Sequence, residues 1–482
     1  MAWWHFVLIG VGAVLLLLIA VVLIRTALFK PKAEIAKDDS ECVVDEERTI
    51  KTLGEMVKCR TVSYVDKSKE DAQEFERFDF LLPTLFPYVT STCERVDVKG
   101  RAIVFRWKGK SSSSPSVLMA HYDVVPVEEE KWSKPAFDAI IEDGVMWGRG
   151  TLDTKVTLNG IMNAVESLIK SGFVPQNDVY LAFGGDEEVN GTGASSVVDY
   201  FEENEITPAL VVDEGGGVVT NVFPGVKQPC GLIGIAEKGM LNVDLTIDTA
   251  GGHASAPPPH TSIGRLSKAC LNIENKPFTF RITKPASEMF DTLGRRSSFL
   301  FRMIFANLWL FKGALNLLCK KSGGEINALM RTTVAFTQMS GSKGINVLPP
   351  VASMRANLRL IEGDTMDSAL EEIRKKANDE GIKVSKISGM NPSRISSVDC
   401  EAYKKVASAV ASTWRDAIVS PYLMVQCSDC RHYGRITDKV YRFSAMDLTK
   451  EERGTIHGND EKIRIESIVR ATEFFTRLAS KL

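Results

Sequence analysis

The sequence lacks a strong charge of either sign and any internal repeat. Its 482 residues carry 59 Lys and Arg against 61 Asp and Glu, a formal net charge of -2. Because there is no global basic field, we expect no nucleic-acid partner. The absence of a repeat excludes a repeat architecture. Low-complexity sequence is confined to the four serines at 111–114, which predict a loop.

Cysteine offers no disulfide framework. The nine cysteines are odd in number and scattered, which agrees with a reducing compartment. Cys427 and Cys430 form one close pair, and no second pair accompanies them. We therefore interpret this stretch as free thiols in a loop, with a metal or redox role as the alternative.

One long apolar run is present near the start of the chain. Residues 6–24 contain only apolar residues and glycine, enough for a helix to cross the ~30 Å core of a bilayer. We predict a retained membrane anchor rather than a cleaved signal, because no small-x-small cleavage site follows. Arg25, Lys30 and Lys32 follow the run and no Lys or Arg precedes it, so the charge pattern favours a cytoplasmic catalytic body.

The composition is that of a globular protein, with 44% hydrophobic and 25% charged residues. Between residues 116 and 213, apolar runs ending in polar turns alternate with helical patterns, which predicts an α/β layer with a largely parallel sheet. A strand at 240–249, a helix at 366–380 and a strand at 382–387 predict an inserted α+β domain. The predicted order is an anchor (1–31), a tether (32–46), a first catalytic segment (47–238), the insert (239–390) and a second catalytic segment (391–482).

Histidine is scarce, and three of the six histidines lie in glycine-flanked polar loops: His121, His253 and His457. A predicted buried strand ends at His121, and Asp123 is placed to hold its second ring nitrogen, as metal-bound histidines need. A lone histidine at a strand end is more often structural. The acidic clusters elsewhere in the chain reverse that interpretation.

Carboxylates follow three further turns or strands. Asp153 ends a glycine-rich turn just before a predicted helix, where by itself it would be a helix N-cap. Glu187 and Glu188 follow one predicted strand, and Asp213 follows the next. Like charges crowded at strand ends cost free energy unless cations offset them. Because zinc takes imidazole and carboxylate ligands, these residues predict a two-metal hydrolase.

These motifs resemble the M20 family of metallopeptidases and amidohydrolases, most closely its N-acyl-amino-acid hydrolases and carboxypeptidase S-like enzymes. The resemblance covers nearly everything from about residue 47 to the end. Its carriers are His-Tyr-Asp-Val-Val-Pro at 121–126, Gly-Arg-Gly-Thr-Leu-Asp at 148–153, Gly-Asp-Glu-Glu at 185–188, Val-Asp-Glu-Gly at 212–215, Gly-His-Ala-Ser-Ala-Pro at 252–257 and Ile-His-Gly at 456–458.

The resemblance implies a phosphorylase/hydrolase-like α/β zinc-peptidase domain with a ferredoxin-like insert that acts as a lid and homodimer interface. It implies two Zn²⁺ ions, with Co²⁺ or Mn²⁺ as alternatives. Glu187 would be the general base, and Asp123 would support a histidine ligand. The implied ligands are Asp153 as the bridge, His121 and Asp213 for one metal, and Glu188 and His457 for the other.

The resemblance also implies how the substrate is held. His253 would stabilise the developing oxyanion, and Asn346 and Arg359 match substrate-contacting positions, with a surface charge as the alternative for Arg359. Relatives commonly carry Asp or Gly after the bridging Asp, at a peptide bond that is often cis, where this chain has Thr154. They also tend to carry glycine near Asp429, where the bulkier residues of this chain would narrow the pocket.

An apolar stretch at 298–319 lies within the insert. Arg302, Asn307 and Lys312 interrupt it, so we predict no second membrane span. We interpret it as lid core or dimer interface. The alternative is that it lies on the membrane or lines a channel for a fatty acyl chain.

The predicted function is hydrolysis of the amide bond of an N-acyl amino acid, or its formation in reverse. The alternative within enzymes is a dipeptidase or carboxypeptidase. The alternative from another class is an inactive metal-binding scaffold, against which Glu187 argues because binding needs no base. For location, the resemblance allows a secreted or lumenal body where the charge pattern favours a cytoplasmic one.

Overall fold

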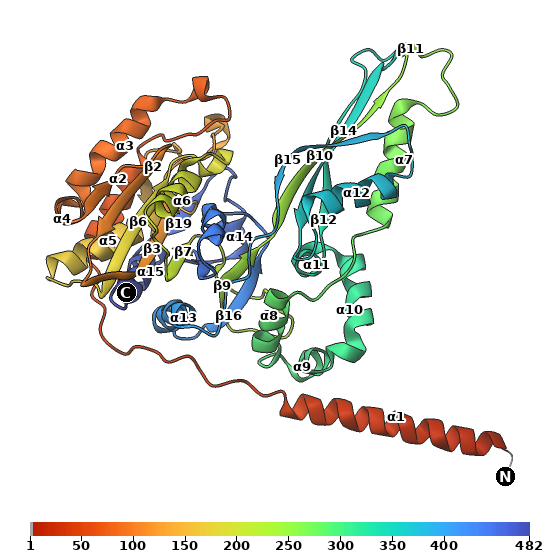
Figure 1. Cartoon of the computed structure of the whole chain (residues 1–482), viewed down its shortest axis with the longest axis horizontal. Helices are drawn as coiled ribbons and strands as arrows, with labels where there is room; N and C mark the ends of the chain where they lie inside the picture. The colour runs from red at the N-terminus through yellow and green to blue at the C-terminus, as the bar shows by residue number, and fades with distance from the viewer. Residues whose placement is uncertain (1–2) are drawn as a thin grey trace.

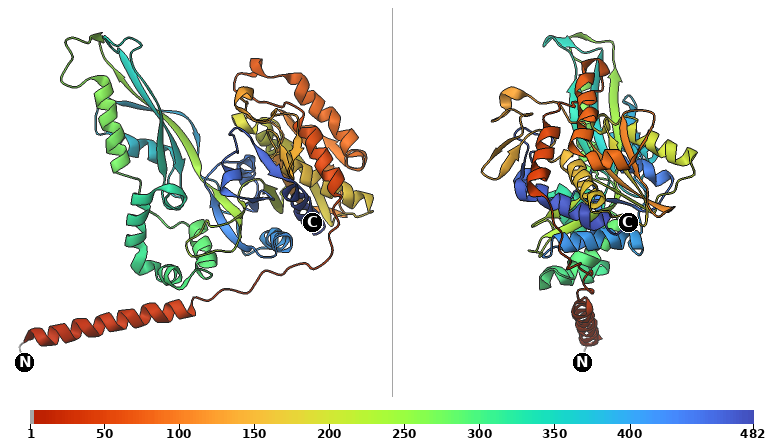
Figure 2. Two further views of the ribbon diagram at one scale, coloured as in Figure 1. Left: turned by 180° about the vertical axis from the view of Figure 1, so that it is seen from behind. Right: turned by 90° about the vertical axis from the view of Figure 1, so that its left-hand side faces the viewer.

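The computed structural model describes residues 3–482 (Figure 1). A large sheet with its helices occupies one side of the molecule, and a smaller sheet lies on the other. Helix α1 (Trp3–Leu28) projects clear of both sheets, as the further views in Figure 2 also show. Residues 29–45, which include most of the predicted tether, form no helix or strand, and α2 (Glu46–Val57) opens the folded body.

The large sheet has ten strands and is mixed. Its centre, β6-β3-β7-β17, is parallel, whereas β1–β2, β2–β6, β8–β9 and β17–β9 are antiparallel. The pairs β9–β16 and β8–β18 are also parallel. The predicted largely parallel sheet is therefore right in part, and short connections such as β1–β2 join antiparallel neighbours. The strands are β1 (Glu94–Val96), β2 (Ala102–Trp107), β3 (Ser111–His121), β6 (Asn177–Gly184), β7 (Leu210–Asp213), β8 (Gly217–Val219), β9 (Cys230–Glu237), β16 (Ile418–Met424), β17 (Val440–Arg442) and β18 (Asp447–Leu448).

The loop predicted for the four serines at 111–114 is wrong. Ser111 pairs with Asn177, and the register then shifts before Ser116 pairs with Val179. The serines therefore form the exposed first part of β3. The pairing with β6 supplies backbone hydrogen bonds that a polar side-chain composition does not reveal.

Helices cover both faces of the large sheet. Leu118 and Ala120 of β3 belong to a core shared with α2, α5 and α15, whereas Val117 and Met119 belong to a core shared with α6. This alternation is that of a strand buried on both faces. The helices are α3 (Ala72–Leu85), α4 (Pro87–Thr92), α5 (Lys155–Lys170), α6 (Gly193–Glu203), α13 (Glu401–Thr413), α14 (Lys450–Arg453) and α15 (Ile465–Ala479), with 3-10 turns η1 (Lys67–Lys69), η2 (Glu129–Lys131), η3 (Glu187–Val189) and η4 (Asp429–Arg435).

A separate three-stranded sheet joins sequence-distant turns. Its strands are β4 (Ile140–Glu142), β5 (Val145–Trp147) and β19 (Lys462–Arg464), in the order β19-β5-β4. Strand β5 leads into the turn that carries Asp153, and β19 follows the loop that carries His457. Their pairing brings the two loops together.

The smaller sheet is antiparallel, in the order β12-β14-β10-β15. Along the chain, its strands and two helices follow one another as β–α–β–β–α–β, with buried residues alternating along β10 as its period-two pattern predicts. The proposed domain boundaries at 239 and 390 stay predictions. The elements are β10 (Gly239–Asp248), α7 (Ser262–Asn275), β12 (Thr333–Ser340), β14 (Val351–Leu360), α12 (Met366–Ala377) and β15 (Lys383–Met390), with the small pair β11 (Gly252–His253) and β13 (Val347–Leu348) beyond them.

The apolar stretch at 298–319 forms two helices that break at Asn307. The elements of this region are α8 (Lys284–Gly294), α9 (Phe299–Ala306), α10 (Leu308–Ser322) and α11 (Gly324–Met330). Phe305 and Cys319 pack with Leu232 and Ile418 of the large sheet, not with the core of the smaller sheet. This stretch therefore packs partly against the large sheet, and its interpretation as lid core or dimer interface stays a prediction.

Helix α1 is long and apolar enough to cross a membrane. It has 26 residues with a mean hydropathy of 3.3, and 6% of its apolar window is buried. A membrane anchor and a signal sequence both fit this observation.

Candidate metal centre

The sheet brings three sequence-distant segments to one edge. Strand β3 lies between β6 and β7 and is parallel to both, so the carboxyl ends of the three strands meet at one edge of the sheet. Strand β3 ends at His121, β6 leads into Glu187 and Glu188 of η3, and β7 leads into Glu214. This is the strand-end cluster that the sequence predicts, with Glu214 added.

His121 is buried and held from both ring nitrogens. Its Nδ1 lies 2.9 Å from the backbone oxygen of Asp123 and 3.4 Å from its carboxylate. Its Nε2 faces the carboxylates of Asp153, at 3.0 Å, and Glu214, at 3.4 Å. A histidine held at Nδ1 with Nε2 facing carboxylates has the arrangement of a metal ligand.

Asp153 lies between two histidines. Its Oδ1 is 3.0 Å from His121 Nε2, and its Oδ2 is 3.0 Å from His457 Nε2. His457 Nε2 is also 3.0 Å from Glu188. The Asp153–Thr154 peptide bond is cis, as the resemblance implies for this position. Asp153 thus has one carboxylate oxygen toward each side of a paired site.

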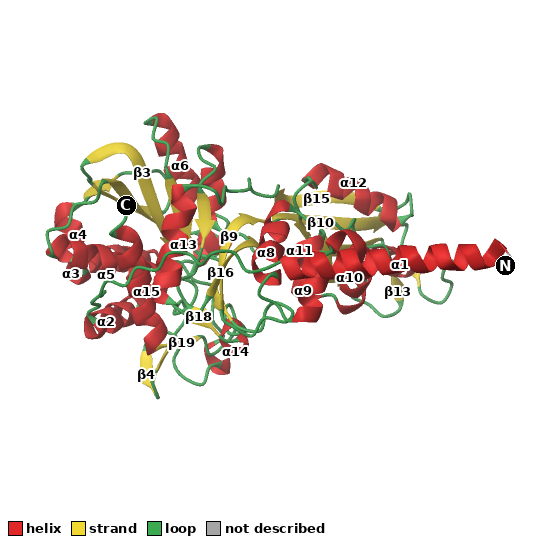
Figure 3. Cartoon of the chain, turned by 90° about the horizontal axis from the view of Figure 1, so that it is seen from below, coloured by secondary structure: helices red, strands yellow, loops and turns green. Residues whose placement is uncertain are grey.

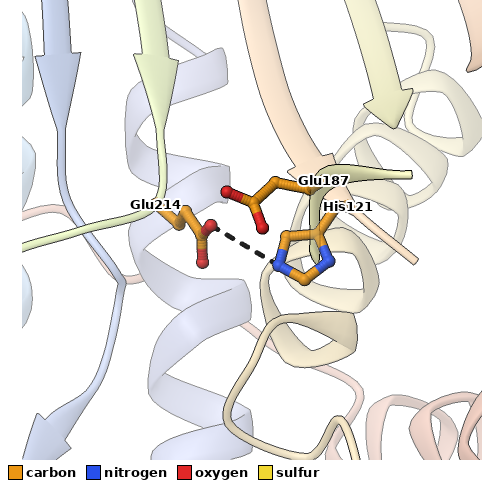
Figure 4. A group of neighbouring side chains, drawn as sticks. All are labelled: His121, Glu187 and Glu214. Atoms are coloured by element: carbon orange, nitrogen blue, oxygen red, sulfur yellow. Dashed lines mark ion pairs between the residues drawn. The ribbon is translucent and has the colours of Figure 1, made fainter. Parts of the chain in front are cut away.

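Two groups of donor atoms have the composition of metal sites. His121, Asp153 and Glu188 form one, and His121, Glu187 and Glu214 form the other, each with its donor atoms within 4.8 Å of one another. Figure 4 shows the second group converging from separate segments, with Glu214 paired to His121. Imidazole and carboxylate donors at this spacing fit zinc or a similar divalent cation.

The charges of the cluster also favour a cation. Without one, burial raises the pKa of Glu187 well above its ordinary value, and Glu214 and Asp429 raise it further. Burial likewise raises the pKa of Glu214 to about 8. Hydrogen bonds to Asp153 and then Glu188 raise the pKa of His457 to about 10. The cluster thus contains more buried carboxylates than the nearby positive charges can stabilise in ionised form.

Asp213, predicted from sequence as a ligand, faces elsewhere. Its Oδ2 accepts a hydrogen bond of 2.9 Å from the backbone N–H of Cys430, and it belongs to neither donor group. The next residue, Glu214, points at His121 instead. The two acids are adjacent in one sequence motif, and only the direction of the backbone after β7 decides which carboxylate faces His121.

Asp123 organises the ends of two strands. Its carboxylate accepts hydrogen bonds from Ser63 Oγ, at 2.7 Å, and from the backbone N–H groups of Glu187 and Glu188, at 3.1 and 3.2 Å. It lies beside His121, as expected from the sequence. One side chain therefore fixes the positions of a histidine and two neighbouring acids.

Glu461 is a positioning residue that the sequence did not single out. It is fully buried and accepts backbone hydrogen bonds from Gly150, Leu152 and Asp153, at 3.0, 2.7 and 3.2 Å. It also pairs with Arg149 at 2.6 Å, and Arg149 binds the backbone oxygen of Gly458 at 2.7 Å. Because its partners lie about 310 residues earlier, local sequence gave no signal for this role.

Three predicted substrate-contacting residues lie outside the cluster. His253 is exposed in β11, at the end of the smaller sheet remote from β3 (Figure 1), with its Nδ1 2.7 Å from Ser255 Oγ. Asn346 is exposed in the adjoining loop and accepts a backbone bond from Ala254. Arg359 is half-buried on β14 and donates to the sulfur of Cys427, at 3.1 Å.

The loop around Cys427 lies beside the metal centre. Asp429 is in η4, and a Cβ added to Gly184 would lie 2.7 Å from its carboxylate. Burial, with Asp213 adding to it, raises the pKa of Asp429 well above its ordinary value. All nine cysteines are free, and Cys430 is buried in this 3-10 turn rather than in an open loop.

Comparison with known proteins agrees with the geometry. Residues 117–481 match the peptidase family M20/M25/M40. A probable carboxypeptidase S-like 2 of Dictyostelium discoideum is 32% identical over 96% of this chain and 91% of its own length. The N-fatty-acyl-amino acid synthase/hydrolase PM20D1 of Xenopus tropicalis is 32% identical over 96% and 92%.

A solved structure shares the fold. The M20 family metallo-carboxypeptidase Sso-CP2 of Sulfolobus solfataricus superposes with a TM-score of 0.63, at 20% identity, over 90% of this chain and 99% of that one. The strand-end cluster, the family match and the two relatives agree with one another. The chain therefore belongs to the M20 family of peptidases and is a hydrolytic enzyme of that family.

Proposed function

We propose that this chain is a zinc-dependent hydrolase that cleaves the amide bond of N-acyl amino acids, or forms it in reverse. The observation that carries the proposal is the pair of donor groups that share His121, together with Asp153, which lies between His121 and His457. The frog relative, an N-fatty-acyl-amino acid synthase/hydrolase by name, supports the substrate class.

We propose five ligands for two zinc ions, which when bound would lower the pKa of water and polarise a carbonyl. Glu214 replaces Asp213 in this set because its carboxylate faces His121, whereas Asp213 accepts a backbone hydrogen bond. Asp213 remains the alternative. The proposed ligands are His121, Asp153, Glu188, Glu214 and His457.

Glu187 is the proposed general base. Its carboxylate lies in the group with His121 and Glu214, and its backbone N–H is fixed by Asp123. In this role it accepts a proton from the attacking water and delivers it to the amine nitrogen as the carbon–nitrogen bond breaks. A raised pKa suits the first half of that task, since a more basic carboxylate accepts the proton readily.

The smaller sheet is proposed as a lid. His253 can stabilise an oxyanion at the cluster only if β11 approaches it, either by closure of the same chain or from a second subunit. Arg359 is proposed to bind the substrate carboxylate, because its guanidinium lies next to the loop that carries Asp429. Asn346 is proposed to contact the substrate from the same lid.

A dipeptidase or carboxypeptidase is the second candidate. The Dictyostelium relative, named a probable carboxypeptidase S-like protein, favours it, and the same cluster can cleave either amide. An inactive scaffold has less support, because a base positioned against the donor groups serves no purpose in binding alone.

The test is hydrolysis by the full-length, zinc-loaded chain, assayed on N-acyl amino acids of long and short acyl length and on dipeptides. Replacement of Glu187 by Gln is expected to lower turnover by ~10²–10⁴-fold while metal content stays unchanged. Glu128→Gln, at a 61% exposed position, is the matched control. Cleavage of dipeptides alone would select the second candidate, and no turnover with both metals bound would overturn the proposal in favour of the scaffold.

A further inference from the structure

The last turns of α1 are packed against the folded body. Val22 and Thr26 are buried, and α9 supplies the contacts. Asn307 Nδ2 donates to the backbone oxygen of Val22 at 3.2 Å and to Thr26 Oγ1 at 3.3 Å. Arg25 donates to the backbone oxygen of Ala306 at 3.1 Å. A signal sequence that is cleaved away would have no need of these side-chain contacts.

The uncovered part of α1 matches the thickness of a bilayer. Residues 3–21 precede the first buried position, Val22, and rise about 28 Å as a helix at 1.5 Å per residue. The hydrocarbon core of a bilayer is about 30 Å thick. If residues 3–21 span that core, its boundary lies at the level of Val22 and therefore of Asn307, where α9 meets α10.

Helices α9 and α10 expose large apolar side chains at that level. Phe299 and Leu300 of α9 are 56% and 60% exposed, and Trp309, Leu317 and Leu318 of α10 are 56–59% exposed. On α10 the apolar positions 309, 310, 313, 314, 317 and 318 recur at helical spacing and form one exposed stripe. An exposed stripe of this kind on a helix is typical of a surface that lies in a membrane interface.

Helix α10 runs across the direction in which α1 projects. Figure 1 shows α10 standing across the line of α1, on the side of the molecule toward the N-terminus. Helix α9 contacts α1, and in Figure 3, seen from below, α9 and α10 overlap the part of α1 nearest the body. A helix that lies across the direction of a membrane span runs along the membrane surface.

The charges around the stripe fit an anionic surface. Between Asp291 and Glu325 the sequence contains no acidic residue and six basic ones. Lys320 and Lys321 end α10, and Lys312 is exposed beside the stripe. Near a membrane, each such cation gains about 1 kcal/mol from anionic headgroups.

We propose that α1 is a retained membrane anchor and that the exposed face of α9 and α10 is a second membrane contact, which rests in an anionic leaflet. Helix α1 fixes the position of the folded body at the membrane, and the contacts of Asn307 with α1 fix the angle between α1 and the body. The apolar stripe lies at the acyl boundary, and the lysines of α10 reach the headgroups. The inference does not depend on which amide the enzyme cleaves.

The test places a nitroxide label at Leu318→Cys, on the stripe, and at Val174→Cys, a 47% exposed control on the large-sheet side. The full-length protein is reconstituted in phosphatidylcholine vesicles with and without phosphatidylserine, and the spectrum of unsubstituted, labelled protein is subtracted to remove the nine native cysteines. Collision rates are measured with oxygen, which enters bilayers, and with a water-soluble nickel chelate. Peptide mass spectrometry checks that residues 3–30 are present.

In vesicles that contain phosphatidylserine, the ratio of oxygen to nickel collisions is expected to be about tenfold higher at position 318 than at position 174. Lys312→Glu combined with Lys320→Glu should reduce that ratio, whereas Lys375→Glu, at a 68% exposed position on α12, should not. Equal ratios at positions 318 and 174 would overturn the proposal. Protection of position 318 from both reagents would also overturn it and would indicate a second copy on this face. Loss of residues 3–30 would contradict a retained anchor.

Discussion

Asp213 and Glu214 are neighbours in sequence, yet their carboxylates face different partners. Glu214 lies 3.4 Å from His121 Nε2, and Asp213 accepts the backbone N–H of Cys430. A ligand forms a bond to the metal. A residue that only holds a ligand in place affects metal affinity indirectly, and its loss typically costs ~10- to 100-fold in that affinity. The two acids should therefore differ in what their loss does to metal binding.

We expect Glu214→Gln to weaken zinc binding more than ~100-fold and Asp213→Asn to weaken it less. The measurement is zinc affinity by competition with a chelator of known affinity, with bound metal counted per chain. Circular dichroism of both variants controls for folding. A larger loss for Asp213→Asn would restore Asp213 as the ligand.

Glu461 should matter to the metal centre without touching the metal. Its Oε1 accepts the backbone N–H groups of Leu152 and Asp153, and its Oε2 accepts that of Gly150 and pairs with Arg149, so an amide at this position would lose one of the two acceptor oxygens. We expect Glu461→Gln to lower zinc affinity by ~10- to 100-fold. Glu466→Gln, at a 61% exposed acid of the next helix, is the control. Unchanged zinc affinity would show that the turn holds its shape without this carboxylate.

The residues of the site were largely predictable from the sequence, but their partners were not. His121, Asp153, Glu187, Glu188 and His457 do come together, because each follows a buried strand or a glycine-rich turn. Glu461 could not be assigned, since its contacts are set by the pairing of β5 with β19. Nor could the choice between Asp213 and Glu214, which depends on the backbone direction after β7.

At the scale of elements, the connection between β9 and β10 contains a buried lysine. Lys238 lies between the two strands and donates to the backbone oxygens of Ala328 and Arg331, both at 2.9 Å. Burial, with the nearby Arg359 adding to it, lowers the pKa of Lys238 to about 7. An unfolded chain would hold the same proton up to a pKa of about 10.4.

Lys238 should therefore make stability depend on pH. Above pH 7 the folded chain has released this proton while the unfolded chain still binds it, so the free energy of unfolding rises with pH. We expect a rise of up to about 1.4 kcal/mol per pH unit between pH 7 and 9.5, relative to Lys238→Met. Urea unfolding of both proteins across that range measures it. Parallel curves would mean that Lys238 stays charged in the fold.

The elements also mark where sequence patterns failed. Strand β10 and helix α12 follow their periodicity and were predictable to within a few residues. The apolar residues at 298–319 were predicted to form lid core or a dimer interface, and local hydrophobicity gave no signal that Phe305 and Cys319 pack with residues of the large sheet. The antiparallel pairs of the large sheet were missed for a similar reason: strand direction follows from the connections between strands, which no local pattern encodes.

At the scale of the whole molecule, the strand that carries His253 stands away from the metal centre. If a second subunit supplies it, two defective chains can repair each other. A mixture of Glu187→Gln and His253→Ala chains would then contain mixed dimers with one complete site.

We expect such an equal mixture, after dissociation and reassociation, to recover about a quarter of the normal activity. Each variant assayed alone is the control, and His253→Ala should lose ~10²–10³-fold in kcat with its metal content unchanged. No recovery in mixtures shown to contain mixed dimers would assign His253 to closure within one chain.

The order of strands in the large sheet has a consequence for how the enzyme is made. Strand β17 lies between β7 and β9, although it is encoded after the entire smaller sheet, and Glu461 and His457 come later still. A nascent chain that has already emerged through Asp213 therefore has a gap at the centre of its sheet and only part of its donor set. Loading of the full metal centre must await the segment that carries His457 and Glu461, so the enzyme acquires its catalytic competence only after that segment has left the ribosome.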